Sequence, residues 1–529
     1  MKRRECCTEC GCLKEQKKQT VLDKVLAIFL LLACVVFGYL NPDNYVINHL
    51  EFINPSFVIV LVFGIPIFAR GLKKLFSGKV SDELYLGLAI VGLTVLGVLA
   101  IYEVIDKTAN YFFYASVVVL FSVIINYTVC DTFRASERKT VKDNKSNVEL
   151  KGEKLGEILS YIGLIVAVIV FCMSFFVFSE EIGLSITKAI GVLVLCAPCV
   201  NTFFVVLAVQ SASKSADDNG ILLKDVTVLE KIMEVEDVFL DTNIVLDENV
   251  TLEKTIAFDG EEDELLCLSA SVLSSVEDGY KKAVLSAVSS IELSCESLEI
   301  FDGGVKGVVG GRVVEVVTPV YLEEKTNHPT PSVTRVQHSV LFVIIDGKLC
   351  GALLFVVNTT EPYKESLAKL KDFGVKTTYF SKDTIACTEK IGKDCKIDNL
   401  VYSLTDKEKE YAVMSKSMQN SGLIMTVTRK EGVNYGANIV VFEGDYKDNV
   451  PSVADVTVKS KNSRYLPFLF KLSKRVLSKI KFNTIITLCV SALSVLLCGV
   501  NLFSIPLASI IYAVLSGIVC LNSCFRKVK

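Results

Sequence analysis

AIGVLVLCAPCVNTFFVVLAV, from Ala189 to Val209, is the most informative segment of the chain. It is predominantly apolar and long enough to cross a lipid bilayer as a helix. Pro198 interrupts it near the middle, and a proline frees backbone carbonyl groups that are tolerated at membrane depth only where protein encloses them. Cys196 and Cys199 flank this break, and thiolates suit soft metals such as Cu(I), Zn²⁺ or Cd²⁺. The sequence therefore predicts a metal site inside a membrane helix, the alternative being two small cysteines that only pack.

A second informative segment lies just downstream. VEDVFLD, from Val235 to Asp241, has the pattern of a buried strand and ends in an acid. Open α/β sheets bind their ligands at the carboxyl ends of parallel strands, so Asp241 is a candidate catalytic residue. An aspartate after a strand also serves commonly as a helix cap or turn former.

Composition places the chain between two classes of protein. Its 529 residues are 51% hydrophobic, more than soluble proteins use, yet 22% are charged, which is too many for a purely intramembrane protein. We therefore expect a membrane protein with a substantial soluble domain. The net charge of −3 gives no indication of a nucleic-acid partner.

Eight apolar runs are long enough to span a bilayer. Basic residues fill the segments at 70–79 and 134–154 and the C-terminal RKVK, whereas the alternate segments hold almost none, Lys107 being the exception. The positive-inside rule then places both termini and the large domain in the cytoplasm of a multi-pass cell-membrane protein. The runs are 25–41, 52–71, 84–104, 111–130, 157–178, 186–209, 482–500 and 503–522.

The N-terminal tail combines basic residues with four cysteines. Cys7 and Cys10 have the spacing of soft-metal ligands, and reduced or palmitoylated juxtamembrane thiols are the alternative.

The soluble segment contains two interleaved patterns. Strand-like runs at 238–241, 376–380 and 423–427 alternate with helical stretches, which predicts a parallel sheet with crossover helices. The inserted part, about 247–357, is richer in glycine and valine. Within it two alternating runs meet at Asp346-Gly347, which predicts a hairpin with a type I′ turn.

The order of these segments resembles that of heavy-metal-transporting P-type ATPases. In that family a helix with a Cys-Pro-Cys motif precedes G-I-L-[IL]-K, L-E and a strand ending in D-K-T-G-T. Here the first motif is Ala197-Pro198-Cys199 and the last is Asp241-Thr242-Asn243-Ile244-Val245. The resemblance implies that Asp241 is the phosphate acceptor and that Cys196 and Cys199 bind the metal.

The same resemblance implies further catalytic residues. The family's T-G-D is Ser381-Lys382-Asp383 here, and Asp406-Lys407 matches the D-K that brings a lysine near the phosphate. Asp383 and Lys407 are therefore candidate catalytic residues beside Asp241.

The family's magnesium-binding G-D-G-x-N-D has two competing placements. Residues 444–449 mimic it in composition, with Asp445 and Asp448 as the acids. Counting back from Val453-Ala454-Asp455-Val456, which resembles A-A-D-I-V, places it instead on Met425–Lys430. We favour the second register, on which no carboxylate remains to bind Mg²⁺.

The nucleotide pocket also departs from the family. S-E-H-P becomes Val276-Glu277-Asp278-Gly279, and G-x-G becomes Asp302-Gly303-Gly304. Asp278 and Gly304 are the candidate nucleotide-binding residues by position. An added carboxylate facing a polyanion is unfavourable, so we expect weak ATP binding.

The family's actuator domain, which supplies the glutamate that hydrolyses the phosphoenzyme, has no counterpart in the sequence. Residues 131–156 stand in its place and resemble a solvated linker without a T-G-E. The expected fold class is a membrane domain of eight helices plus an α/β domain, namely a HAD-like phosphorylation domain with an inserted α+β nucleotide-binding domain. The boundaries are 1–24 (tail), 25–130 (spans one to four), 131–156 (loop), 157–211 (spans five and six), 212–246 with 358–481 (phosphorylation domain), 247–357 (nucleotide-binding-like domain) and 482–529 (spans seven and eight with the C-terminal tail).

We expect a catalytically impaired relative of these pumps with a metal-binding or regulatory role. The resemblance implies ATP, Mg²⁺ and a soft metal ion as ligands, and the bilayer and an intact P-type ATPase as partners. The rival hypotheses are an active ATP-driven heavy-metal exporter whose actuator is supplied by another polypeptide, and a decaying paralogue with no function.

Overall fold

The computed structural model divides the chain into two compact parts. We call them the helical part, Met1–Ser215 with Arg475–Lys529, and the sheet part, Ala216–Lys474. The structure describes residues 55–76, 82–102, 111–123, 147–195, 199–241, 244–246, 250–276, 279–288, 293–301, 303–325, 331, 333, 337–402, 406–419, 422–444, 453–459, 464–499 and 505–523.

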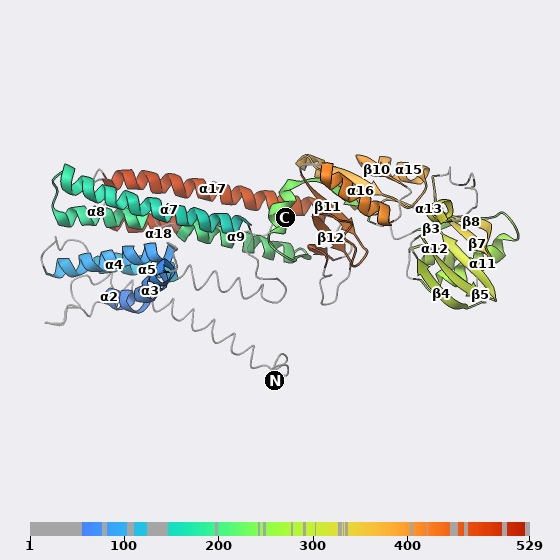
Figure 1. Ribbon diagram of the computed structural model, residues 1–529, viewed down its shortest axis with the longest axis horizontal. Helices are drawn as coiled ribbons and strands as arrows, with labels where there is room; N and C mark the ends of the chain where they lie inside the picture. The colour runs from blue at the N-terminus through green and yellow to red at the C-terminus, as the bar shows by residue number, and fades with distance from the viewer. Residues whose placement is uncertain are drawn as a thin grey trace, which may run out of the picture. The chain divides into compact units, whose positions relative to one another are not determined.

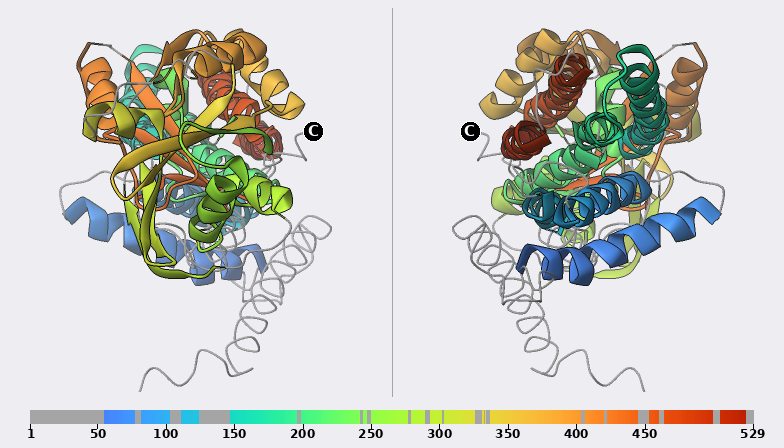
Figure 2. Two further views of the ribbon diagram at one scale, coloured as in Figure 1. Left: turned by 90° about the vertical axis from the view of Figure 1, so that its right-hand side faces the viewer. Right: turned by 90° about the vertical axis from the view of Figure 1, so that its left-hand side faces the viewer.

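The helical part is a bundle of apolar helices (Figures 1 and 2). Helix α8 packs against α7, α4 and α18, and α4 packs against α3 and α5. Short π-helical segments, η1 (Val60–Gly64) and η3 (Met173–Val177), continue α2 and α7. The helices are α2 (Pro55–Ile59), α3 (Ile65–Phe76), α4 (Asp82–Ile101), α5 (Tyr111–Val123), α7 (Asn147–Cys172), α8 (Ile182–Leu195), α9 (Cys199–Asp217), α17 (Tyr465–Gly499) and α18 (Ile505–Ser523).

Among the described residues, three helical stretches are long and apolar enough to cross a membrane. They are Ser56–Lys73, Leu150–Val177 and Tyr465–Leu497. Shorter apolar helices occupy Leu84–Ala100, Tyr111–Leu120, Ile182–Leu195 and Val514–Ser523, within or beside predicted spans. The predicted span at 25–41 lies outside the described residues, and the number of eight stays a prediction.

Helix α7 begins earlier than the sequence indicated. We predicted a solvated linker at 131–156, but α7 starts at Asn147, so its last ten residues are helical. They include Leu150, Lys151, Glu153, Lys154 and Leu155, side chains with high helix propensity, and the adjoining apolar run extends the same helix. The rest of the predicted linker lies outside the described part of the chain.

The sheet part contains a seven-stranded sheet in the order β1-β13-β12-β11-β2-β9-β10. All neighbours are parallel except β1 and β13, which confirms the predicted parallel sheet. Its strands are β1 (Ile221–Leu223), β2 (Val235–Leu240), β9 (Lys376–Phe380), β10 (Asn399–Val401), β11 (Leu423–Thr428), β12 (Ile439–Glu443) and β13 (Val456–Val458).

Helices connect these parallel strands, as crossover connections require. Helix α15 (Ile385–Cys395) joins β9 to β10, and α16 (Asp406–Gln419) joins β10 to β11. Helix α14 (Glu361–Leu370) and η6 (Lys371–Phe373) lead into β9, while α10 (Val228–Lys231) and η4 (Ile232–Glu234) lead into β2. The strands in the middle of the sheet are almost wholly buried, which explains their continuous apolar sequence.

An antiparallel six-stranded sheet, in the order β3-β8-β7-β6-β5-β4, is inserted between β2 and β9. Strands β7 and β8 meet at Asp346 and Gly347, both with positive φ, which confirms the predicted type I′ hairpin. The elements are β3 (Thr251–Ala257), α11 (Glu262–Leu273), α12 (Gly279–Ala287), β4 (Cys295–Phe301), β5 (Gly304–Val309), β6 (Arg312–Val317), α13 (Pro319–Lys325), β7 (Ser339–Ile345) and β8 (Lys348–Val356).

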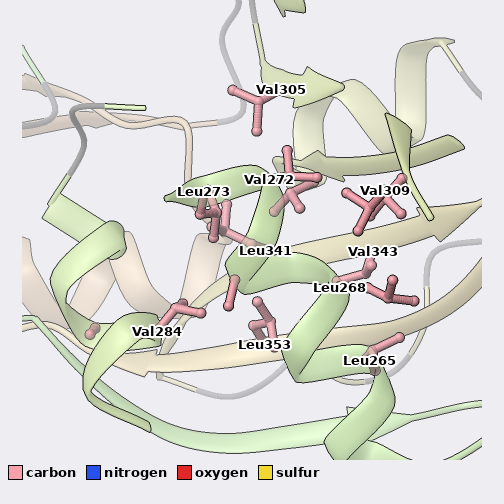
Figure 3. Close-up of a cluster of buried hydrophobic side chains, with 14 of the residues drawn as sticks. Leu265, Leu268, Val272, Leu273, Val284, Val305, Val309, Leu341, Val343 and Leu353 are labelled. Atoms are coloured by element: carbon pink, nitrogen blue, oxygen red, sulfur yellow. The ribbon is translucent and has the colours of Figure 1, made fainter. Parts of the chain in front are cut away.

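The inserted domain has its own hydrophobic core, formed by α11 and α12 against the sheet (Figure 3). Leu265, Leu268 and Val272 from α11 face Leu341 and Leu353 from β7 and β8. Valine-rich strands suit this packing because branched side chains fit a pleated, half-covered face. The coarse fold class predicted from the sequence, apolar helices plus an α/β domain, is therefore confirmed.

Candidate functional site

Asp241 lies at the carboxyl edge of the seven-stranded sheet. It follows β2, which has β11 on one side and β9 on the other. The Asp241 backbone N–H donates to the carbonyl of Val427 at 3.0 Å, and this bond extends the β2–β11 ladder by one residue. The side chain is buried. The candidate acceptor is thus fixed at the edge where open α/β sheets bind ligands.

Three donors surround the Asp241 carboxylate. Lys409 Nζ lies 2.6 Å from Oδ1, and Oδ2 accepts from Thr428 Oγ1 at 3.0 Å and from Tyr435 Oη at 3.1 Å. A buried carboxylate requires such partners because it has lost its water. Both oxygens are therefore engaged within the protein.

Lys409, rather than the predicted Lys407, is the lysine that reaches Asp241. Both residues are on α16, but Lys407 is exposed and Lys409 is fully buried. Residues two apart on a helix point to opposite sides, so only one of them can face the sheet. The match to the family's D-K motif had therefore assigned this role to a lysine two positions before the one that contacts Asp241.

The Lys409 ammonium is buried, and besides bonding Asp241 it lies 5.9 Å from the centre of the Tyr435 ring. Burial lowers its pKa, and repulsion from Lys430 and Lys382 acts in the same direction. The Asp241 carboxylate opposes this shift, so the pair depends on both members.

The position of strand β11 bears on the two registers of the magnesium motif. It pairs directly with β2, with Val427 opposite Leu240, so its carboxyl end at Thr428 lies beside Asp241. Gly444 follows β12, one strand further from β2, and Asp445 and Asp448 lie outside the described residues. The strand order agrees with the register that we favoured.

The residues at that strand end are not magnesium ligands. Thr428 bonds Asp241, Lys430 contributes a cation, and Arg429 Nη2 pairs with Glu443 at 3.0 Å. Glu443 is buried and also accepts from Tyr363 and Tyr465. Glu443 is therefore committed to a structural role and is not available to bind Mg²⁺.

Asp383 follows β9, on the other side of β2, but its carboxylate bonds the inserted domain. Oδ1 accepts from Ser339 Oγ at 2.5 Å, and the backbone N–H of Val340 also approaches it. Ser339 in turn contacts Tyr280 Oη at 2.8 Å. Burial raises the pKa of Asp383 to about 6, although both hydrogen bonds oppose the rise. This contact, 44 residues apart in sequence, had no signal in the motif.

The two candidate nucleotide-binding residues have different outcomes. Asp278 lies outside the described residues. Gly304 begins β5, and a Cβ there would lie 2.6 Å from the Val316 carbonyl oxygen. Close approach of two strands is thus sufficient reason for this glycine, and its nucleotide role stays a prediction.

The segment that holds the two predicted metal-binding cysteines lies between the described ends of two helices. Helix α8 ends at Leu195 and α9 begins at Cys199. Cys196, Ala197 and Pro198 lie outside the described residues, as does the side chain of Cys199. The ligand role of the thiols stays a prediction.

An ion pair joins the buried Lys188 of α8 to the partly exposed Glu180, which precedes that helix. Lys188 Nζ on α8 is 2.7 Å from both carboxylate oxygens of Glu180, and the Ser174 hydroxyl in η3 donates to the same carboxylate. This pair was not predicted from the sequence, although a lysine within an apolar run is itself a signal.

Mg²⁺ does not fit the residues placed around Asp241. Across the described ranges, no group of three or more His, Cys, Asp or Glu side chains is placed to hold a metal ion. Lys409, Lys430 and Lys382 supply positive charge where Mg²⁺ would need carboxylates.

No protein-family model matches the sequence. The copper-exporting P-type ATPase B of Archaeoglobus fulgidus is 22% identical over 384 residues, which cover 70% of this chain and 54% of that protein. The copper-exporting P-type ATPase of Mycobacterium tuberculosis is 22% identical over 337 residues, covering 61% and 43%. The chain thus spans about half the length of these curated relatives.

Solved structures share its architecture. A zinc-transporting PIB-type ATPase in the E2.Pi state superposes with a TM-score of 0.64 at 16% identity, covering 95% of this chain and 99% of that one. A second structure of a zinc-transporting PIB-type ATPase, in another state, gives 0.58, also at 16% identity, and covers 94% of this chain. The heavy-metal P-type ATPase resemblance predicted from the motifs is therefore supported, and the chain has the fold of a PIB-type ATPase.

Proposed function

We propose that this chain is an integral membrane protein of the heavy-metal P-type ATPase kind whose phosphorylation site does not turn over. On this proposal it retains the scaffold of such a pump, with the sheet part in the cytoplasm, and acts by binding a soft metal ion or by regulating an intact pump. The relatives named above are copper exporters, and the matching folds are zinc transporters.

One observation carries the proposal. The Asp241 carboxylate accepts from Lys409, Thr428 and Tyr435, while the neighbouring strand β11 ends in Thr428-Arg429-Lys430 instead of an acid. A nucleophilic carboxylate must approach the γ-phosphate beside Mg²⁺ and with few competing donors. Each lost transition-state contact of this kind costs orders of magnitude in rate.

Asp383 supports the same conclusion. On the family resemblance it would serve the phosphoryl transfer, but here it accepts from Ser339 and is buried. Its Oδ1 is therefore already committed to a bond with the inserted domain.

The direct test is phosphorylation of membranes that contain the full chain. They are incubated with γ-phosphate-labelled ATP and Mg²⁺, with and without Cu(I), Zn²⁺ or Cd²⁺, and quenched in acid. We expect no acid-stable label above that of Asp241→Asn, whereas an intact heavy-metal P-type ATPase in parallel membranes is labelled. Metal-stimulated label that Asp241→Asn removes would contradict the proposal and support the exporter with an actuator supplied in trans.

The metal-binding role needs its own experiment. We expect the purified chain to bind Cu(I), Zn²⁺ or Cd²⁺ with a stoichiometry that falls when Cys196 and Cys199 are both replaced by serine, and that ATP leaves unchanged. Co-purification of an intact P-type ATPase with the chain would point to the regulatory role. Binding that is insensitive to both serine replacements would remove the membrane metal site.

A further inference from the structure

Two connections join the inserted domain to the seven-stranded sheet, one from β2 to β3 and one from β8 to α14. Leu246 of the first connection forms an antiparallel bridge with Thr359 of the second, and the Thr360 backbone N–H donates to the Val245 carbonyl at 3.4 Å. Domain hinges consist of a few such loop residues, whose φ and ψ angles can absorb a rotation. We therefore call this paired segment, residues 244–246 and 357–360, the hinge of the inserted domain.

A side-chain contact also crosses between the two domains. Asp383, which follows β9, accepts from Ser339 Oγ at 2.5 Å, and Ser339 is the first residue of β7 in the inserted sheet. The Val340 backbone N–H bonds the same carboxyl group. Ser339 and Asp383 are both buried, so water does not compete for this contact. A rotation that opens the hinge would separate the two side chains and admit water to Asp383.

Tyr280 on α12 fixes the direction of the Ser339 hydroxyl. Its Oη lies 2.8 Å from Ser339 Oγ, and a serine hydroxyl has one proton, which here points to Asp383. Tyr280 is therefore the donor to Ser339. Its ring packs edge-on against that of Phe355 on β8, with 4.8 Å between the ring centres, so the inserted domain holds the tyrosine in place.

The second oxygen of Asp383 shows which protonation state this contact suits. Oδ2 is buried and has no hydrogen-bond partner in the part of the chain that the structure describes. A bare, buried carboxylate oxygen is costly, whereas a neutral carboxyl group can carry its proton on that atom. The contact with Ser339 therefore suits neutral Asp383, and exposure to water suits the ionised form.

We propose that Asp383, Ser339 and Tyr280 form a proton-dependent latch between the two domains. With a proton on Asp383, the latch holds the inserted domain against the end of β9. When that proton leaves to water, the carboxylate gains hydration if the inserted domain turns about its hinge, and the latch opens. This inference goes beyond the proposed function, since the latch requires neither ATP nor a metal ion.

The direction of the pH effect follows from the two environments of Asp383. Burial raises its pKa from 3.8 to about 6 in the latched form, and water returns it towards the ordinary value in the open form. The latch is therefore complete below about pH 4 and weakens as the pH rises to about 6. Over that range the equilibrium constant for opening should rise about a hundredfold, and above it the constant should stay level.

The titratable neighbours of the latch respond differently. Tyr379 on β9 and Cys387 on α15 are buried, and burial, followed by the charge of Asp383, raises the pKa of both, so neither loses its proton in this range. His338, which precedes Ser339, pairs with Glu253 of β3, and histidines change charge between about pH 5 and 8. The test of the latch therefore has to separate His338 from Asp383.

Fluorescence energy transfer within the full chain in detergent tests the latch. Bio-orthogonal amino acids at Met418 on α16 and Ile300 on β4, both well exposed, carry the two dyes. We expect the transfer efficiency to shift between about pH 5 and about pH 8 by an amount that corresponds to about tenfold more opening at the higher pH.

Variants assign the movement to the latch. Asp383→Asn keeps an oxygen for Ser339 but cannot lose a proton, so its transfer efficiency should stay at the value that the unmodified chain shows at about pH 5. Ser339→Ala removes the bond and should raise opening about fivefold at either pH, which also shows that the dyes report the movement. Asp394→Asn, an exposed acid on α15, is the matched control and should follow the unmodified chain. Thermal unfolding verifies that each variant is folded.

Several results would overturn the inference. They are a transfer efficiency that is equal at both pH values, opening on acidification, and a Ser339→Ala variant that opens no more than the unmodified chain. A pH response that persists in Asp383→Asn would also overturn it, because the response would then belong to another group such as His338. The phosphorylation experiment on Asp241 is independent of all these outcomes, since the energy-transfer samples contain neither ATP nor a transported metal.

Discussion

Lys409 Nζ lies 2.6 Å from Asp241 Oδ1, and both side chains are buried although 168 residues separate them in the sequence. This pair joins α16 to the end of β2. It is both the main support of the candidate acceptor and the contact that occupies it.

The pair makes a stability prediction. Lys409→Met should lower the free energy of unfolding by roughly 3 kcal/mol, because it removes the cation that faces a buried carboxylate. The measurement is thermal or denaturant unfolding of the full chain in detergent. Lys407→Met, on the exposed side of the same helix, is the control and should have little effect.

A double-mutant cycle separates pairing from packing. Asp241→Asn with Lys409→Met should be less destabilising than the sum of the two single changes, since the second removes the charge that the first leaves unpaired. Simple additivity would mean that the two groups are not coupled.

Replacing Thr428 by aspartate should create a response to Mg²⁺. Thr428→Asp places a second carboxylate beside Asp241, and like charges at that distance destabilise the fold. Mg²⁺ should then reverse the loss, raising the melting temperature of this variant by several degrees and leaving the unmodified chain unaffected.

Thr428→Asn is the matched control, since it has a similar shape without the charge. Equal response of the aspartate and asparagine variants to Mg²⁺ would show that the edge cannot be converted into a metal site by one carboxylate.

Asp383 predicts a pH dependence of stability. Burial raises its folded-state pKa from 3.8 to about 6, so the folded chain holds this proton more tightly than the unfolded chain does. The stability that this proton contributes is fully present below about pH 4 and is lost as the pH rises through about 6. The total loss in the free energy of unfolding is roughly 3 kcal/mol. Asp383→Asn keeps an oxygen for Ser339 and should flatten this part of the profile, making the variant the more stable form at about pH 7.

The measurement is the melting temperature of the full chain between about pH 4 and about pH 8, a range that brackets the titration. Asp372→Asn, an exposed acid before β9, is the control and should follow the unmodified chain. Parallel curves for Asp383→Asn and the unmodified chain would rule out a buried, titrating Asp383.

The ion pair of Lys188 and Glu180 should stabilise the helical part, and exchanging the two charges should preserve part of that stability. Glu180→Gln should destabilise the helical part by about 2 kcal/mol, because it leaves a buried ammonium without its counter-charge. Glu180→Lys with Lys188→Glu should recover part of that loss. Glu181→Gln, the exposed neighbour, is the control. Unfolding in detergent micelles measures each variant, and no loss in Glu180→Gln would mean that the pair is dispensable.

Local patterns predicted much of the framework. The alternation of the strands at 376–380 and 423–427 and the pair Asp346-Gly347 indicated the parallel sheet and the type I′ hairpin, because backbone preferences act over a few residues. Asp241 could be placed at the end of β2 for the same reason. Counting residues back from Asp455 placed the magnesium motif on Met425–Lys430, and the strand that ends there, β11, is the one that pairs with β2.

The partners of these residues came only from the tertiary structure. Whether Lys407 or Lys409 faces the sheet depends on the rotation of α16 about its axis, which packing decides and a motif match cannot. The bonds of Thr428 and Tyr435 to Asp241 join residues 187 and 194 positions apart, and that of Asp383 to Ser339 joins two sheets. By itself the sequence determined the main strands of the sheet and the position of Asp241 at the end of one of them, since both follow from short-range preferences. Only the folded chain decided which donors surround Asp241, because they converge from distant segments through the burial of helix and sheet faces.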